Sequence, residues 1–261
     1  MNRIVVYTAL YGNKDTLKDP INYNRNSNID LFCFTDNINL TSSYFKIIHV
    51  PPVFSDLSKN SKKVKIIGFD GILNYDVAIW HDASLQIDFN KIHELLKFSE
   101  NTISAFRHPR RTCLYREAIS CVIYRRDYNF RIILQIFLLM ILGYPVNIGL
   151  TENTILVINV KKYFSSAIPQ IWWRFVKNLS KRDQLSLCYA LFKTKTKPGI
   201  LEGNGFSNQY SVHSIHLYDN FIDKSILGKL NFKFGTTFSI LMLRILRKMA
   251  SLKNRANNYH I

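Results

Sequence analysis

The sequence YDVAIWHDAS, residues 75–84, changes character within a few positions. Its first part is rich in β-branched and aromatic residues, which predicts a buried strand over Tyr75–Trp80. That strand runs directly into His81 and Asp82, with Ser84 two residues further on. The Asp82 carboxylate can bind a divalent cation at this place, or it can cap the turn that follows. The segment alone does not decide between the two.

Apolar runs elsewhere predict further strands, and these alternate with segments of helical spacing. The expected strands are residues 3–10, 29–35, 44–50, 102–106 and 154–160, and the expected helices are residues 61–73, 92–98, 115–124, 130–142 and 172–192, the last with a break near Ser180. This alternation predicts an α/β fold, a mostly parallel sheet flanked by helices. Ligands of such sheets lie beyond the carboxyl ends of the strands. The segments to inspect are therefore residues 11–15, 35–37, 81–84 and 107–111.

The chain is strongly basic, with 35 Lys and Arg against 18 Asp and Glu among 261 residues and a net charge of +17. Such a charge favours phosphorylated substrates, an anionic membrane surface or nucleic acid. No zinc finger, RRM signature or KH loop is present, so we expect no nucleic-acid partner. The lack of a P-loop and of a GxGxxG motif argues against a nucleoside triphosphatase or a simple dinucleotide oxidoreductase.

Residues 221–261 differ from the rest, because they hold eight Lys and Arg and one acid. We therefore expect an α/β domain over residues 1–220 and a basic amphipathic helical tail over residues 221–261. Apolar residues recur there at helical spacing, at Phe238, Leu241, Met242, Ile245, Met249 and Leu252, and Arg244, Arg247, Lys248 and Ser251 fall on the opposite side. The pattern is typical of a helix in the interface of an anionic membrane, and it also fits a helix packed on the domain.

The apolar runs of the chain are short. The amino-terminal run is too short for a signal peptide, and residues 132–142 fall well below the roughly 20 residues that span a bilayer. We expect a cytoplasmic protein that is peripheral on the inner face of the cell membrane.

Two further segments carry basic groups that suit a ligand. Lys62 and Lys65 are three residues apart and share a helix face, from which they can meet phosphate oxygens or remain solvated. His108 and Arg111 lie in a polar turn before a helix, where they can bind an anion or an acceptor hydroxyl.

Taken in order, the segments resemble the glycosyltransferase-like domain family, which includes plant Golgi proteins related to cell-wall and mucilage synthesis and bacterial proteins of polysaccharide biosynthesis. The matching segments, within roughly residues 3–192, are Val-Tyr-Thr-Ala-Leu-Tyr-Gly (6–12), Cys-Phe-Thr-Asp-Asn (33–37), the Lys-rich segment, Trp-His-Asp-Ala-Ser-Leu-Gln-Ile (80–87), His-Pro-x-Arg with Tyr-x-Glu-Ala (108–118), Gly-Leu-x-Glu-Asn (149–153), Trp-Trp (172–173) and Arg-Asp-Gln-Leu-Ser (182–186). The resemblance implies a GT-A fold, a nucleotide-sugar donor and commonly Mn²⁺ or Mg²⁺.

The resemblance also implies roles on the donor side. Asp82 matches the DxD element, as a ligand of the metal or of the donor ribose, with Ser84 in the second polar place. This chain has Asp-Ala-Ser, and a single carboxylate binds these cations weakly without help, so metal dependence is open. His213 or His216 would be the helper. Further donor-binding residues are Thr8, Tyr11 and Gly12 toward the base and ribose, and Lys62 and Lys65 toward the diphosphate.

On the acceptor side, Asp183 is the expected general base of an inverting reaction, and Glu152 competes for that role. Asp183 can equally cap the helix that it opens. The residues expected at the acceptor or at a phosphate are His108, Arg111, Arg182 and Gln184.

We therefore expect a glycosyltransferase that moves a sugar from a nucleotide-sugar donor to a glycan or glycolipid acceptor at the cytoplasmic membrane face. The acceptor would be lipid-linked or a surface polysaccharide of the lipopolysaccharide, O-antigen or capsule type. The alternatives are a lipid-acting hydrolase on the same scaffold and a non-catalytic module that binds an anionic membrane or nucleic acid.

Overall fold

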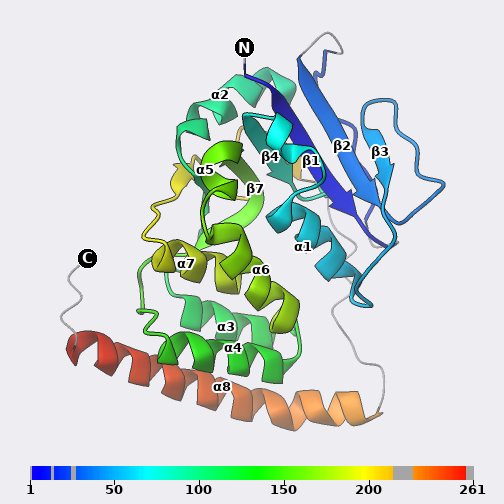
Figure 1. Ribbon diagram of the computed structural model, residues 1–261. Coiled ribbons are helices and arrows are strands. Elements are labelled where there is room, and N and C mark those ends of the chain that lie inside the picture. Colours follow the sequence, from blue (N-terminus) through cyan, green and yellow to red (C-terminus); the bar gives the residue numbers. More distant parts are fainter. Residues whose placement is uncertain (1, 13–14, 25–27, 214–225, 257–261) are drawn as a thin grey trace.

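A seven-stranded sheet runs through the upper part of the molecule in the computed structural model, which describes residues 2–12, 15–24, 28–213 and 226–256 (Figure 1). The strand order is β3 (Lys46–His49), β2 (Ile29–Thr35), β1 (Ile4–Leu10), β4 (Val77–His81), β7 (Thr151–Asn159), β6 (Ile103–Arg107) and β8 (Gly199–Leu201). Neighbouring strands pair in parallel, except that β7 is antiparallel to both β4 and β6. The expected α/β class, a mostly parallel sheet flanked by helices, is confirmed.

Each face of the sheet has its own apolar core, because successive side chains of a strand point to opposite faces. Tyr7 packs on the face that is covered by α1 (Leu57–Ile67), α5 (Val160–Phe164), α6 (Ile168–Asn178) and α7 (Gln184–Lys193). Val6 packs on the other face, under α2 (Ile92–Leu96) and the small sheet of β5 (Leu85–Ile87) and β9 (Ser211–His213). Three short 3-10 turns complete the described elements, at Ile72–Asn74, Phe89–Lys91 and Lys97–Glu100.

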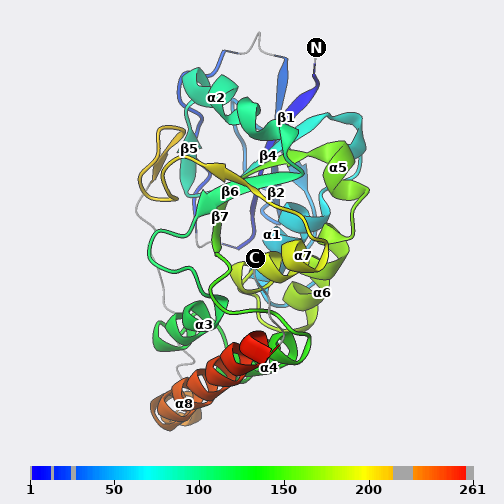
Figure 2. The same ribbon diagram turned by 90° about the vertical axis from the view of Figure 1, so that its left-hand side faces the viewer.

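A layer of three helices lies beneath these cores: α3 (Leu114–Ile123), α4 (Asn129–Ile141) and α8 (Ile226–Ala256). The long helix α8 crosses below both α3 and α4 (Figures 1 and 2). It buries Ser239, Leu243, Leu246 and Ala250 against them. Within the described part of the chain, no helix combines the length and apolar character needed to cross a membrane.

Several predicted boundaries shift for local reasons. Helix α1 begins at Leu57, where the Asp56 side chain accepts a hydrogen bond from Ser58 N. It ends before Gly68, whose φ of 77° is a left-handed conformation that favours glycine. The helix expected over residues 172–192 is two helices with the predicted break at Ser180. The short elements β5, α5, β8 and β9 are additions to the predicted set.

The face that α8 buries is not the face that the sequence singled out. Phe238, Leu241, Ile245, Met249 and Leu252 are 43–62% exposed, whereas Leu243 and Leu246 are buried. The helix thus has two apolar stripes, and packing uses the one that also carries Ser239 and Ala250. The expected boundary between residues 220 and 221 lies outside the described residues.

Candidate functional site

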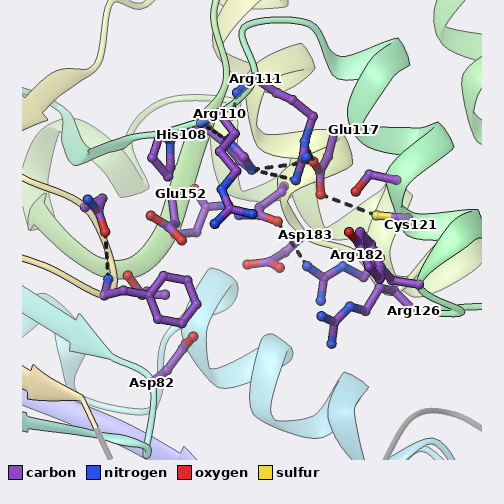
Figure 3. A pocket seen from close by; sticks show the side chains of 18 of the residues that line it. Asp82, His108, Arg110, Arg111, Glu117, Cys121, Arg126, Glu152, Arg182 and Asp183 are labelled. Atoms are coloured by element: carbon purple, nitrogen blue, oxygen red, sulfur yellow. Dashed lines mark hydrogen bonds and ion pairs between the residues drawn. The ribbon is translucent and has the colours of Figure 1, made fainter. Parts of the chain in front are cut away.

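A pocket of about 640 Å³ opens where the carboxyl end of β4 meets the start of β7, α1, α3 and the start of α7 (Figure 3). Its lining contains nine of the residues expected in the site, namely Lys62, Lys65, Asp82, His108, Arg111, Glu152, Arg182, Asp183 and Gln184. The other lining residues are Pro109, Arg110, Glu117, Ser120, Cys121, Tyr124, Arg126, Asn153, Thr154, Asn204 and Phe206. The fold therefore gathers one polar cavity from segments that lie far apart in the chain.

The end of β4 positions Asp82. Its backbone N donates to Thr154 O at 2.9 Å, which continues the antiparallel pairing with β7. The carboxylate does not cap the following turn, because Oδ1 accepts from Trp80 Nε1 at 3.0 Å and lies 3.5 Å from Lys65 Nζ. The side chain is 40% exposed, so it can still receive a ligand from the pocket.

Helix α1 directs two lysines onto the Asp183 carboxylate. Lys65 Nζ lies 2.8 Å from Asp183 Oδ2, and Lys62 Nζ lies 3.1 Å from Asp183 Oδ1. Lys65 also donates to the backbone O of Asn153 at 2.6 Å and lies 5.5 Å from the centre of the Trp80 ring. These contacts decide two alternatives that the sequence left open: neither lysine belongs to a solvated face, and the Asp183 side chain does not cap α7.

The two lysines respond differently to their surroundings: burial outweighs Asp183 at Lys62 and lowers its pKa, whereas the pKa of Lys65 is raised. Burial opposes the charge of Lys65, but Asp183 and Asp82 outweigh burial and raise the pKa of Lys65 above its ordinary value. Burial likewise opposes the charge of Asp183, but Lys62, Lys65 and Arg182 together hold its pKa far below the usual range. Asp183 is consequently a weak base, and its contacts suit a counter-ion that orients the two lysines.

Glu152 has the opposite character. Burial raises the pKa of its carboxyl, and the charges of Asp82 and Glu117 add to the increase, although Oε2 accepts from Gly205 N at 2.8 Å. A carboxylate with a raised pKa, inside the pocket, is better matched to accept a proton near neutral pH than Asp183 is. The opposite directions of the two pKa shifts favour Glu152 between the two predicted bases, and the choice stays a prediction.

A second network holds two of the expected acceptor residues, His108 and Arg111, while Arg182 Nη2 donates to Gln184 Oε1 at 3.0 Å. The Nδ1 atom of His108 accepts from the backbone N atoms of Arg110 and Arg111, both at 3.1 Å. Arg111 Nε donates to the Glu117 carboxylate, and His108 Nε2 lies 3.5 Å from the same carboxylate oxygen. Burial lowers the pKa of His108, although the neighbouring Glu117 charge acts in the other direction. This network fixes the turn before α3.

A divalent cation would find few protein ligands here. In the described ranges, no three His, Cys, Asp or Glu side chains come close enough to hold a metal ion together. Asp82 offers one carboxylate, and one of its oxygens already accepts from Trp80 and faces Lys65. The described residues do not form a protein cage for Mn²⁺ or Mg²⁺. The roles proposed for them below therefore involve no bound metal, and metal dependence stays a prediction.

Four expected donor residues lie outside the pocket lining. Thr8 is fully buried in β1, and Ser84 is 5% exposed in the turn after β4. Burial and the charge of Asp36 raise the pKa of Tyr11 to about 12, and Gly12 N donates to Asp36 Oδ1 at 2.9 Å. They occupy the carboxyl ends of β1 and β4, as expected, but their contact with a donor stays a prediction.

The two histidines proposed as metal helpers differ in what the structure says of them. His213 lies in β9, opposite Leu85, and its ring stacks on Phe206 with a centroid distance of 4.9 Å. Phe206 lines the pocket, so His213 stands behind the pocket rim. His216 lies outside the described residues.

Sequence reasoning missed Glu117, Arg110 and Arg126. Glu117 is 4% exposed, and an acid on an apolar helix face next to the expected Arg111 was the available signal. Arg126 follows a helix whose packing is set by distant segments, so its surroundings in the chain carried no such signal.

Comparison with solved structures finds glycosyltransferases at low similarity. An active-site mutant of LgtC matches with 11% identity and a TM-score of 0.41, over 72% of this chain and 70% of that chain. The galactosyltransferase LgtC in complex with donor and acceptor sugar analogs matches with 12% identity and a TM-score of 0.37, again over 72% of this chain and 70% of that chain. The glycosyltransferase GlyE of Streptococcus pneumoniae TIGR4 matches with 14% identity and a TM-score of 0.43. This match covers 93% of this chain but only 62% of GlyE. No protein-family model and no curated protein matches the sequence. At these values the likeness does not extend to the role of any residue.

Proposed function

We propose that the chain is a glycosyltransferase that takes a sugar from a nucleotide-sugar donor in the 640 Å³ pocket. The observation that carries the proposal is the convergence of Lys62, Lys65, Asp82 and Glu152 on one polar cavity at the carboxyl end of β4. Lysines suit a diphosphate, and a second carboxylate in the same cavity suits an acceptor hydroxyl.

On the donor side, Lys62 and Lys65 would neutralise the charge that develops on the leaving diphosphate. Asp183 keeps both ammonium groups in place, because each lies within 3.1 Å of one of its carboxylate oxygens. Asp82 lies beside Lys65 and is the most exposed carboxylate of the cluster. It would hold the donor ribose.

On the acceptor side, Glu152 would act as general base in an inverting reaction. The acceptor oxygen would attack the anomeric carbon, and its proton would pass to the Glu152 carboxylate. The bond between the anomeric carbon and the diphosphate oxygen would break, and that oxygen would keep the electron pair. The raised pKa of Glu152 favours this role over that of Asp183.

A thermal-shift panel of nucleoside diphosphates and sugar nucleotides, with and without Mn²⁺, tests the proposal. A ligand that binds only the native state raises the unfolding midpoint according to its concentration and Kd. We expect a rise for at least one nucleotide in wild type and its loss in Lys65→Met, with Lys63→Met as the control, because Lys63 is exposed on the same helix. Sugar transfer would then be lost in Asp82→Ala. Failure of every nucleotide to bind wild type would remove the proposal.

We also propose that the helical layer attaches the protein to an anionic membrane. The exposed apolar stripe of α8 is joined by a second one on α4, formed by Phe130, Leu134, Phe137 and Ile141, which are 43–64% exposed. The two helices lie close together at their carboxyl-terminal ends, where Lys253 Nζ of α8 donates to the backbone O of Ile141 at 3.1 Å. Exposed apolar side chains gathered on neighbouring helices suit an interaction surface.

The charge of this surface supports lipid as the partner. The sequences of α4 and α8 contain no Asp or Glu, while Arg131, Arg244 and Lys248 lie beside the stripes. Basic residues near an anionic membrane surface contribute about 1 kcal/mol each. Tyr124 and Arg126 line the pocket at the end of α3, which packs against both α4 and α8. An acceptor held in the membrane would therefore reach the pocket from the side of this layer.

A further inference from the structure

The wall of the pocket that faces α3 and the segment before α7 carries two arginines, Arg126 and Arg182. In the view of Figure 3, their guanidinium groups and the carboxylates of Asp82 and Glu152 lie on opposite sides of Asp183. Lys62 and Lys65 both contact Asp183, and Lys65 also reaches Asp82. We call these two lysines the lysine wall, and Arg126 and Arg182 the arginine wall.

The end of α3 sets the direction of Arg126. Arg126 N donates to Cys121 O at 2.8 Å and Arg125 N donates to Val122 O at 3.1 Å, which is the hydrogen-bond pattern of a Schellman motif. Arg125 has a φ of 49°, a left-handed conformation that is unfavourable for residues other than glycine. The unfavourable conformation of Arg125 turns the chain at the end of α3, and this turn places Arg126 in the lining of the pocket.

A buried acid joins the two arginine segments. Asp127 is 1% exposed, and its Oδ2 accepts from Ser180 Oγ at 2.8 Å and from Lys181 N at 2.7 Å. Arg126 directly precedes Asp127 in the chain, and Arg182 directly follows Lys181. Ser180 Oγ in turn accepts from Arg182 N at 3.2 Å. Asp127 therefore fixes the backbone of both arginines relative to each other.

The lining as a whole is positive, because it contains six Lys and Arg against four Asp and Glu. Within 4.0 Å, three of the four carboxylates form ion pairs with Lys62, Lys65 and Arg111. Arg110, Arg126 and Arg182 supply the rest of the Lys and Arg side chains of the lining. Arg182 also lowers the pKa of Asp183, and its Nη2 atom donates to Gln184 Oε1 at 3.0 Å. Arginine forks match phosphate and carboxylate oxygens in geometry as well as in charge.

We infer that Arg126 and Arg182, with Arg110 at the rim, bind an anionic group of the acceptor, a phosphate or a carboxylate. The inference rests on the proposed function and narrows it, because it makes the acceptor an acidic molecule. The lysine wall takes the donor diphosphate, and the arginine wall takes the acceptor anion. Asp127 is a positioning residue of this subsite.

The test uses the full chain saturated with the nucleoside diphosphate that binds it best, so that the lysine wall is filled. Inorganic phosphate, hexyl phosphate and hexanol are then titrated by calorimetry. We expect both phosphates to bind and hexanol not to bind. We expect Arg126→Gln and Arg182→Gln each to weaken phosphate binding about tenfold. Arg116→Gln, an exposed position of α3 outside the lining, should stay within twofold of wild type.

Asp127→Asn supplies the positioning test. It should weaken phosphate binding severalfold while the affinity for the nucleoside diphosphate stays within twofold, which general damage to the fold would not produce. Tighter binding of hexyl phosphate than of inorganic phosphate would identify a lipid-type headgroup as the source of the anion. Equal binding of the two would identify a free or sugar-borne anion, and both results support the subsite.

Two outcomes separate the inference from the proposed function. If the nucleoside diphosphate binds but phosphate binds equally well to wild type, Arg126→Gln and Arg182→Gln, the arginine subsite is wrong and the donor site stands. If no nucleotide binds but phosphate binding still depends on both arginines and not on Lys62, the anion subsite stands and the glycosyltransferase proposal is wrong.

Discussion

Lys65 Nζ lies 2.8 Å from Asp183 Oδ2, and the two side chains are only 4% and 7% exposed. This contact joins α1 to the start of α7 in the lining of the pocket. A buried pair of this kind keeps its charges only while both partners are present, since removal of one leaves the other uncompensated. The pair therefore links the stability of the fold to the geometry of the donor side.

Asp183→Asn should lower the free energy of unfolding by about 3–5 kcal/mol, because it leaves Lys62 without its carboxylate and the buried Lys65 with only the longer contact to Asp82. Urea titration of wild type and variant measures the difference. Glu94→Gln removes the exposed pair between Lys91 and Glu94 and is the control, with no change expected beyond error. A loss below about 1 kcal/mol in Asp183→Asn would contradict the role that we assign to the pair.

The same pair predicts an acid dependence. The pKa of Asp183 in the folded state is far below that of an unfolded aspartate, about 3.9. Its contribution to stability is therefore complete above that unfolded value and is lost as the pH falls below it. His81 adds a separate window, because burial lowers its pKa to about 4, so stability also falls as the pH drops from about 6.5 to 4. In His81→Asn, the free energy of unfolding measured against pH should no longer fall between about pH 6.5 and 4, while the loss due to Asp183 at lower pH should remain.

Sugar transfer should depend on Glu152 through its protonation state. The carboxylate must be ionised to accept a proton, and its pKa is raised, so kcat should increase with pH through a midpoint above the ordinary glutamate value of about 4.3. Glu152→Gln should abolish this limb and lower kcat roughly 10²–10⁴-fold. Glu202→Gln, at an exposed position, is the matched control. If kcat of Glu152→Gln depended on pH as it does in wild type, another group would be the general base.

The sequence predicted the sheet well because its strands carry a local signal. The strand expected over residues 29–35 has the observed bounds of β2, and the strand expected over residues 75–80 corresponds to β4, which begins two residues later and ends one residue later. The rule for parallel sheets pointed to Asp82 and to residues 107–111 at strand ends. Lys65 and Asp183 entered the same hypothesis only through the family resemblance, because Lys65 lies within α1 and the start of α7 carries no such signal.

The helical layer was less predictable, because helical periodicity identifies apolar stripes without saying which one is covered. In α8, Leu243 and Leu246 repeat with the same period as Phe238 and Ile245 but lie on a neighbouring face. Contacts with α3 and α4, which are distant in sequence, decide between the faces. The roles of Arg126 and Asp127 depend on the same distant contacts and were missed for the same reason.

Helices α3 and α4 end in the same motif with different residues at its left-handed position. Arg125 occupies it after α3, with a φ of 49°, and Gly143 occupies it after α4, with a φ of 80°. Arg125→Gly should therefore stabilise the fold by about 1 kcal/mol, measured by urea unfolding. Gly143→Ala is the reciprocal control and should lower the stability by about 1 kcal/mol. The new Cβ would meet no heavy atom within 4 Å, so the cost would come only from the left-handed backbone conformation. A destabilised Arg125→Gly would mean that the side chain contributes more than the turn costs.

Membrane attachment should need the stripe of α4 as well as that of α8. The measurement is cosedimentation with phosphatidylcholine vesicles that contain or lack phosphatidylglycerol. Wild type should bind the anionic vesicles, and added salt should weaken that binding, since surface charges are screened. Phe137→Glu and Ile245→Glu each remove an exposed apolar side chain from the surface and should weaken binding roughly tenfold.

The two substitutions together decide how the surface is built. Ile38→Glu, at a position 79% exposed that follows β2 and belongs to none of α3, α4 and α8, should bind as wild type does and controls for the added negative charge. Loss of binding in Ile245→Glu with normal binding in Phe137→Glu would confine attachment to α8. Normal binding in both would remove the membrane proposal, because the apolar stripes would then face something other than lipid. Loss in both, with Ile38→Glu unaffected, would place the α3 end and its pocket rim next to the bilayer, since α3 packs against the two helices that bind it.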